Sequence, residues 1–319
     1  MIDLSNHNSL INKEVVRNLE IILKNKIFSN GYIFYGPEGI GKKQTAMKFI
    51  KEIFNEYSSN SNIEEKIIDN NHPDFLLIEP TYLIKGNLIR RSETESQKNN
   101  KETIRIDQIR NIKIFLSQKS IESGKKVVLI VDAHLLNESA SNCLLKTLEE
   151  PTNGIFILLT SKMNLLLNTI ISRCQLIRFK SFSFKEIENF INNNLDYSIT
   201  NIYEELNLQD LIYDANGSPG QILKNIKIWK EIPNEIKDNL NFPLNNNLEI
   251  LTIAKLITEK LEIDQQIFFV NFLQNKWWKK TKNINIIKNL EVLKLNLKNL
   301  IQPRLSWEIS LLKIAIEEL

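Results

Sequence analysis

The chain has 319 residues, of which 42% are hydrophobic and 25% are charged, and its formal net charge is +3. These values are typical of a globular protein with two or three domains, and so small a charge gives no basis for strong nonspecific nucleic-acid binding. The two cysteines, Cys143 and Cys174, exclude a disulfide framework and zinc-site spacing, which favours a cytoplasmic location. The sequence predicts no signal peptide and no membrane span.

The first predicted elements are an amphipathic helix over residues 12–26 and a short apolar strand over 33–35. A turn with the sequence Gly-Pro-Glu-Gly-Ile-Gly-Lys-Lys follows, and apolar residues then recur at helical spacing over 46–53. A strand, a glycine loop and a helix in this order are the context of a phosphate-binding loop, or P-loop. Its glycines let consecutive N–H groups face an anion, and the helix N-terminus adds positive partial charge.

This P-loop departs from the usual pattern at one position. Gly36, Gly41 and Lys42 match G-x-x-x-x-G-K-[ST], with Gly39 between them, but Lys43 takes the place of the Ser or Thr. That hydroxyl normally binds Mg²⁺, and an ammonium cannot bind a cation. The loop is therefore expected to bind phosphate or to persist as an empty structural loop. Lys43 could add charge for a phosphate, but we expect it instead to repel Mg²⁺.

Four further apolar runs predict strands that alternate with helices, at 75–78, 127–131, 155–160 and 176–179. Residues 56–71 are predicted as loop or short helix, 86–102 as a surface loop, and Asp107 as the N-cap of a helix. The alternation predicts a parallel sheet with right-handed crossovers. Asp132 ends the most strand-like run, so it is expected in the ligand crevice of the sheet, unless it only caps the next loop.

From Phe182 onward the sequence shows only helical periodicity. Helices are predicted, in order, over 182–195, 208–226 with a break at 217–220, 248–282, 286–297 and 305–319, with a linker at 233–243. The predicted architecture is an α/β parallel-sheet P-loop domain over 1–181, a small helical unit over 182–230 and an all-α C-terminal domain over 231–319.

Three motifs resemble the clamp-loader branch of the AAA+ ATPases. They are the strand that ends in Asp132, Leu-Leu-Lys-Thr-Leu-Glu-Glu-Pro at 144–151 and Ser-Arg-Cys at 172–174. The resemblance covers about residues 6–219 and returns at Gln-Pro-Arg-Leu, 302–305. It implies an AAA+ domain, a helical lid, and a C-terminal collar that joins subunits into a hetero-pentameric ring. Such rings open the sliding clamp and close it around primed DNA.

Departures from the active members of this branch concern ATP hydrolysis. Active members carry adjacent Asp and Glu where this chain has Val131 and Asp132, although a shift of one residue would restore the Asp. Their lid helix carries an Arg after Gly-Ser, in the stretch where this chain has Gly220. Together with Lys43, up to three parts of the phosphoryl-transfer machinery are altered. Many relatives also carry a four-cysteine zinc module after the P-loop helix, and residues 54–72 contain no cysteine.

Arg173 carries the strongest functional expectation. In this branch the Arg enters the ATP site of the neighbouring subunit and stabilises charge on the transferred phosphoryl group; the alternative is a surface Arg with local ion pairs. Thr160 stands where the family has a sensor of the γ-phosphate. Cys174 is expected to be buried rather than nucleophilic. Trp277 and Trp278 lie among lysines, where DNA contact competes with a collar helix that buries one Trp.

The resemblance and its departures imply a scaffold subunit that hydrolyses little or no ATP and supplies Arg173 to a motor subunit. The expected partners are the motor and delta subunits of the ring, the sliding clamp, and primed DNA through the assembly, with no membrane. The expected ligand of the degenerate site is ATP, without zinc and with Mg²⁺ left open, and its residues are Gly36, Gly39, Gly41, Lys42, Lys43, Asp132 and Thr160.

Catalysis by the isolated chain is left open. As a scaffold the chain would be part of a DNA-directed DNA polymerase holoenzyme, a nucleotidyltransferase. The alternative is an active AAA+ ATPase, either a clamp-loader motor subunit or a helicase motor, for which Lys43, Val131 and Gly220 are the wrong residues.

Overall fold

The computed structural model describes residues 12–57, 62–84, 87–90, 102–150, 154–194, 208–239 and 246–316. The chain forms two compact units, one of Met1–Leu195 with Asn216–Gln221 and one of Asp196–Ala215 with Ile222–Leu319. The predicted three-part division, with boundaries after residues 181 and 230, stays a prediction.

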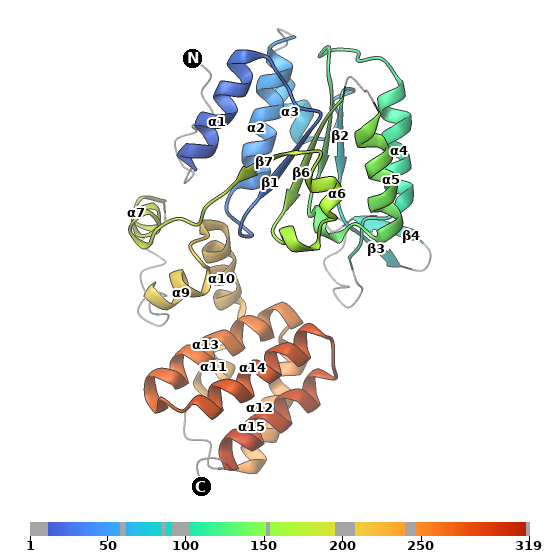
Figure 1. Ribbon diagram of the computed structural model, residues 1–319. Helices are drawn as coiled ribbons and strands as arrows, with labels where there is room; N and C mark the ends of the chain where they lie inside the picture. Colours follow the sequence, from blue (N-terminus) through green and yellow to red (C-terminus); the bar gives the residue numbers. More distant parts are fainter. Residues whose placement is uncertain are drawn as a thin grey trace. The chain divides into compact units, whose positions relative to one another are not determined.

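A five-stranded parallel sheet in the order β2-β5-β6-β1-β7 forms the centre of the first unit (Figure 1). Its strands are β1 (Gly31–Tyr35), β2 (Phe75–Ile78), β5 (Lys126–Ile130), β6 (Gly154–Thr160) and β7 (Gln175–Arg178). The interior strands β1, β5 and β6 are buried and nearly all apolar, as expected for a parallel sheet covered on both faces. The parallel α/β sheet predicted from the sequence is therefore confirmed.

Helices cover both faces of this sheet (Figure 1). Helices α1 (Lys13–Asn25) and α2 (Lys42–Asn55) lie on one face, and α3 (Ile63–Ile68) packs against α2. Helices α4 (Ile106–Ser117) and α5 (Glu138–Glu149) pack together on the other face. Helices α4 and α5 each bury one face because their apolar residues recur at helical spacing. These residues pack with those of the sheet in one core cluster. Its members from α4 and α5 are Ile109, Ile112, Ala140, Leu144 and Leu148.

Shorter elements connect the strands of the first unit. The 3-10 helix η2 (Ala133–Leu135) follows β5, and η3 (Met163–Leu165) and α6 (Asn168–Ile171) follow β6. Helix α7 (Phe184–Asn194) follows β7.

Two local predictions in the first unit are wrong. Residues 87–90 of the loop predicted over 86–102 form strand β4 (Asn87–Arg90), which pairs antiparallel with β3 (Thr81–Ile84), and residues 91–101 lie outside the described part. Helix α4 starts one residue after Arg105, whose N–H donates to Gln108 Oε1 at 3.0 Å. Asp107 therefore lies within the first turn and pairs with Arg110 at 3.1 Å, instead of capping the helix.

The second unit is helical throughout its described residues. Its helices are α9 (Leu208–Asp214), α10 (Pro219–Glu231) from Ile222 on, α11 (Asn234–Asn239), α12 (Asn247–Lys260), α13 (Ile263–Thr281), α14 (Ile284–Lys298) and α15 (Pro303–Ile316). The predicted break at 217–220 is present at Gly217 and Ser218, whereas Pro219 and Gly220 already belong to α10. The predicted linker at 233–243 is wrong over α11, because Ile236 is fully buried there.

Two tryptophans in the core of the second unit, Trp277 and Trp307, are fully buried, and Trp229 is 3% exposed. Trp307 Nε1 donates to Gln266 Oε1 at 3.0 Å, and Gln266 Nε2 donates to the Leu261 carbonyl at 2.8 Å. Trp277 is fully buried whereas Trp278 is 41% exposed. Trp277, Trp278 and the lysines beside them are therefore part of the core helix α13, which has one solvated face. This is the collar helix with one buried Trp that was predicted as the alternative to DNA contact.

Candidate functional site

The glycine loop connects β1 to α2 at the carboxyl end of the sheet. The Gly36 N–H donates to the carbonyl of Thr160, the last residue of the neighbouring strand β6, at 3.3 Å. Gly41 is the N-cap of α2 with a φ of 93°, a left-handed conformation that glycine adopts without strain. The strand–loop–helix arrangement predicted for a P-loop is therefore present.

The Lys42 ammonium lies on the loop itself. Its Nζ donates to the carbonyl oxygens of Gly36 and Pro37 at 2.7 and 2.5 Å. Burial lowers the pKa of Lys42 to about 8, although the Asp132 and Glu38 carboxylates oppose this shift. A bound phosphate would favour the charged form of the same ammonium. This corner of the site therefore fits an anion.

The Lys43 ammonium is paired with a carboxylate. Its Nζ lies 2.7 Å from Glu79 Oε1, just beyond the end of β2. The position that normally offers a hydroxyl to Mg²⁺ therefore offers none, and its cation is already matched by an anion of the same chain. The residues present fit a phosphate better than a Mg²⁺–phosphate complex.

The first turn of α10 lies against the P-loop, within the same compact unit. Ser218 Oγ donates to the Glu38 carbonyl at 2.6 Å, and the Gly220 N–H donates to the Gly39 carbonyl at 3.0 Å. A Cβ on Gly220 would lie 2.7 Å from the Gly39 oxygen, closer than packed atoms approach. A side chain at position 220 would therefore clash with the Gly39 backbone of the loop.

Asp132, His134 and Thr160 lie at the same edge of the sheet. Asp132 follows β5 with a φ of 50°, and its charge acts on both Lys42 and His134. Thr160 is fully buried, its Oγ1 accepts from the Lys162 N–H at 3.1 Å, and it lies 3.3 Å from His134 Nδ1. The structure thus brings Asp132 and Thr160 together with the P-loop, as their predicted positions require.

His134 is a site residue that the sequence reasoning did not single out. Burial lowers its pKa; the Asp132 and Glu38 carboxylates oppose the shift, and the Lys162 and Lys42 cations add to it. The imidazole is therefore neutral near pH 7 and can exchange a hydrogen bond with Thr160. The sequence could have indicated His134 as a site residue, because it follows the strand-ending Asp132 by two positions.

Arg173 lies in a turn after α6, immediately before β7. Its Nη1 donates to the Thr169 carbonyl at 2.9 Å, and its Nη2 lies 2.5 Å from Glu149 Oε1. The Arg173 side chain is 36% exposed. Two of the three motifs that carry the clamp-loader resemblance thus meet in one ion pair, and the local ion pair considered for Arg173 is present.

Arg173 and the P-loop lie at opposite ends of the sheet. Strand β7 begins at Gln175, which is level with Tyr32 of the parallel strand β1. At about 3.3 Å per residue, β1 then runs about 13 Å further to Gly36, and Arg173 lies on the far side of Gln175. An Arg side chain does not span that distance, so Arg173 cannot reach the P-loop of its own chain.

Cys174 packs at the start of β1. A Cβ on Gly31 would lie 2.7 Å from Cys174 Sγ, and burial raises the pKa of the thiol to about 11. A thiol with so high a pKa is protonated at neutral pH and is a weak nucleophile, in agreement with the predicted packing role.

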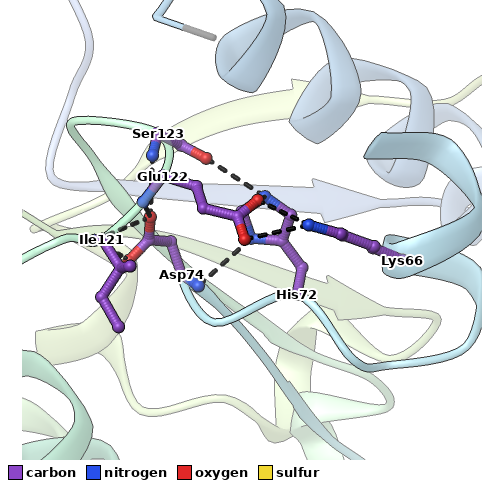
Figure 2. Close-up of polar contacts among 6 residues, drawn as sticks. All are labelled: Lys66, His72, Asp74, Ile121, Glu122 and Ser123. Carbon is purple, nitrogen blue, oxygen red and sulfur yellow. Dashed lines mark hydrogen bonds and ion pairs between the residues drawn. The ribbon is translucent and has the colours of Figure 1, made fainter. Parts of the chain in front are cut away.

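A second polar cluster lies at the amino ends of β2 and β5 (Figure 2). The Asp74 carboxylate accepts three backbone N–H bonds from the turn before β5, at 2.7 to 2.8 Å for the shortest bond of each donor. The donors are Ile121, Glu122 and Ser123. Lys66 Nζ lies 2.8 Å from Glu122 Oε2, which ties the same turn to α3.

The Ser123–His72 contact in this cluster, at 3.2 Å, invites comparison with a nucleophile and its base. His72 Nδ1 accepts from the Asp74 N–H at 3.1 Å, so in the neutral ring Nε2 carries the proton. A protonated Nε2 cannot take a proton from Ser123. Burial lowers the pKa of His72, which keeps the ring neutral. The cluster therefore anchors a turn and is not a catalytic site.

Within the described ranges, no group of three or more His, Cys, Asp or Glu side chains is placed to hold a metal ion. The helices of the described part likewise include none that is long and apolar enough to cross a membrane.

The fold and the site define a P-loop protein of the AAA+ type. The solved structure of a DNA polymerase III gamma subunit-related protein from Thermotoga maritima covers 93% of this chain and 98% of its own length, with a TM-score of 0.52 and 19% identity, which shows the shared fold.

Two family models then identify the branch. A model described as DNA polymerase III, delta subunit matches residues 11–183, more than half of the chain. A second, described as the cyanobacterial DNA polymerase III delta prime C-terminal domain, matches residues 194–314. The chain belongs to the DNA polymerase III delta subunit family.

Relatives of known name agree with this assignment. The delta' subunit from Bacillus subtilis is 32% identical over 167 residues, 50% of this chain and 45% of the relative. The delta' subunit from Pseudomonas aeruginosa is 32% identical over 153 residues, 46% of this chain and 42% of the relative. The tau subunit from Bacillus subtilis is 31% identical over 206 residues, 64% of this chain and 34% of the relative. The chain thus spans less than half the length of these relatives.

Proposed function

We propose that this chain is the delta-prime subunit of a bacterial clamp loader, a scaffold that helps to load the sliding clamp on primed DNA. In this proposal it supplies Arg173 to the ATP site of a neighbouring motor subunit and hydrolyses little or no ATP itself. The ring also contains motor and delta subunits, contacts primed DNA through the assembly, and works in the cytoplasm.

One observation carries the proposal: the Arg173 guanidinium is held at the surface, at the end of the sheet opposite its own P-loop. A guanidinium stabilises the charge that develops on a transferred phosphoryl group, an effect on the order of a thousandfold or more in phosphoryl transfer. Because Arg173 cannot reach a nucleotide of its own chain, its position supports a role in the ATP site of another subunit.

The state of the P-loop supports weak or absent hydrolysis by this chain. Lys42 is bonded to two loop carbonyls, and Lys43 is paired with Glu79. Gly220 occupies the first turn of α10 where active relatives offer an Arg to the γ-phosphate. ATP remains the expected ligand, held through Lys42 and the loop N–H groups without the usual Mg²⁺ hydroxyl.

The proposal is tested by reconstitution with motor and delta subunits from the same organism. The isolated chain is expected to show negligible ATP turnover with and without Mg²⁺. The mixture is expected to form one complex by native mass spectrometry and to load a sliding clamp on primed DNA only when this chain is present. Arg173→Ala in this chain is expected to lower the ATPase of the complex, because the neighbouring ATP site then lacks its trans cation.

Two results would contradict the proposal. Turnover of the isolated chain at the rate of a motor subunit would favour the alternative, an active AAA+ ATPase. Clamp loading at the full rate without this chain would remove the scaffold role.

A further inference from the structure

We infer that Glu149 is a positioning residue for Arg173, which aims the guanidinium at the phosphates of the neighbouring subunit. This inference rests on the proposed function and adds a residue to it. It also joins the Glu-Glu-Pro and Ser-Arg-Cys motifs, which are separated in the sequence, in one functional contact.

The contact fixes the plane of the guanidinium from two sides. Nη2 is bound by Glu149 Oε1 at 2.5 Å, and Nη1 is bound by the Thr169 carbonyl at 2.9 Å. The guanidinium is a planar fork, so two anchors on different nitrogens set its orientation. The other N–H groups of the fork are then available for phosphate oxygens.

The two anchors belong to a rigid frame. Glu149 is the last residue of α5, and Thr169 lies in α6. Leu148, beside Glu149, and Ile170, beside Thr169, are members of the same buried core cluster. The position of the guanidinium therefore follows the packed core and not the surface alone.

Glu149 is placed where a helix disfavours an anion. The C-terminal end of a helix carries negative partial charge, so a carboxylate there is unfavourable without a cation nearby. Arg173 supplies that cation for Glu149, and Lys113 does so for Glu150 at 3.1 Å. Each of the two glutamates thus has its own partner, and only Glu149 is paired with the cation that acts in trans.

The Glu149–Arg173 contact is strong enough to orient the guanidinium but too weak to keep it from a phosphate. The side chains of Glu149 and Arg173 are 53% and 36% exposed, and a pair this exposed is weak. A phosphate with several charged oxygens readily displaces water from the remaining N–H groups of Arg173. Glu149 can therefore orient Arg173 before the neighbour arrives and stay bonded while the phosphate binds.

The test compares Glu149→Gln with Glu150→Gln, a matched control whose side chain is 55% exposed. Both are assembled with motor subunits whose own Ser-Arg-Cys arginine is replaced by Ala, so that only the ATP site facing this chain hydrolyses. Glu149→Gln is expected to lower kcat about fivefold with KM for ATP unchanged, the factor that corresponds to an exposed ion pair. Glu150→Gln is expected to leave kcat unchanged, and Glu149→Asp to restore it in part.

A second measurement uses the isolated chain. Phenylglyoxal modifies exposed guanidinium groups, and the rate at Arg173 is read by peptide mass spectrometry. Loss of the Glu149 carboxylate is expected to speed the modification by up to about fivefold, and Glu150→Gln is expected to leave it unchanged. An equal rate in both variants would show that the contact does not hold Arg173.

The outcomes separate this inference from the proposed function. In an Arg173→Ala background, Glu149→Gln should cause no further loss, because its effect passes through the guanidinium. If Arg173→Ala lowers kcat but Glu149→Gln does not, the positioning role is wrong and the trans role stands. If Arg173→Ala has no effect, the trans role fails, and this inference fails with it.

Discussion

The P-loop and the Arg173 corner, by which we mean Arg173 with Glu149 and Thr169, differ in how their cations are held. In the P-loop, Lys42 binds the loop's own carbonyls and Lys43 binds Glu79. At the corner, Arg173 is half-exposed and lies between two anchors that leave part of its fork open. The Lys42 ammonium is directed into its own loop, whereas Arg173 keeps part of its fork open at the surface.

In the proposed function, this difference lets one chain keep a nucleotide site of low activity and still serve catalysis in a neighbouring subunit. Carbonyl and carboxylate groups of the same chain already bind the two lysine ammonium groups of its P-loop. A surface guanidinium needs an external anion to complete its hydrogen bonds. The predictions that follow test each side of this comparison.

The largest expected effect concerns the contact between α10 and the loop. In Gly39→Ala the new Cβ would lie 2.6 Å from Ser218 Oγ and 2.8 Å from the Gln221 nitrogen, at a φ of 73°. We expect a loss of about 2–4 kcal/mol in the free energy of unfolding, measured by urea denaturation. Gly41→Ala is the control, because its Cβ has room and only the backbone strain of about 1–2 kcal/mol remains. Equal losses would show that the contact does not constrain position 39.

The next effect is the pH dependence of anion binding. The pKa of Lys42 is about 8 in the free chain, and a bound phosphate raises it, so binding takes up a proton. Affinity for pyrophosphate should therefore be full below pH 8 and fall as pH rises above it, by about tenfold per unit until the pKa of the complex is reached. Calorimetry over pH 7 to about 9.5 measures this slope, and Lys42→Met should remove it. An affinity independent of pH in the unsubstituted chain would exclude Lys42 from the anion site.

A smaller effect is expected from Mg²⁺. Because Lys43 offers no hydroxyl and is paired with Glu79, Mg²⁺ should not strengthen ATP binding to the chain. Lys43→Thr restores a metal ligand and is expected to make ATP binding about tenfold stronger with Mg²⁺ than with EDTA. Titration of a fluorescent ATP analogue in both conditions distinguishes the two chains. Strong Mg²⁺ dependence in the unsubstituted chain would mean that its site is not degenerate.

The smallest effect is the contribution of Arg173 to stability. An exposed ion pair is worth at most about 1 kcal/mol, so Arg173→Ala should change the free energy of unfolding by less than that. Thermal denaturation of the isolated chain measures the change. A larger loss would mean that the guanidinium is mainly a structural brace.

Much of the fold could be predicted from local pattern. Apolar runs between turn residues located β5 and β6, and the glycine loop between strand and helix located the P-loop. The hairpin β3–β4 was missed because its Leu83 and Leu88 are half-exposed and give no core pattern. The start of α4 was misplaced because Gln108, rather than Asp107, completes the cap.

The sequence predicted most residues of the candidate site, but not His134 and not the carboxylates that pair with Lys43 and Arg173. Resemblance and strand ends pointed to Lys42, Asp132 and Thr160, which the fold brings together. The Lys43–Glu79 and Arg173–Glu149 pairs join residues far apart in the chain. The hydrophobic periodicity of a sequence predicts helices and strands but not such pairs. They depend on how strands and helices pack, which only the folded chain defines.

The most direct test of the account is the ATPase of a loader in which only the site facing this chain can hydrolyse. Motor subunits with Ala at their own trans arginine are assembled with this chain, either unsubstituted or with Arg173→Ala, and kcat is measured with primed DNA and clamp. The account predicts a loss on the order of a thousandfold or more in Arg173→Ala, with assembly unchanged. An undiminished kcat in a fully assembled complex would contradict it.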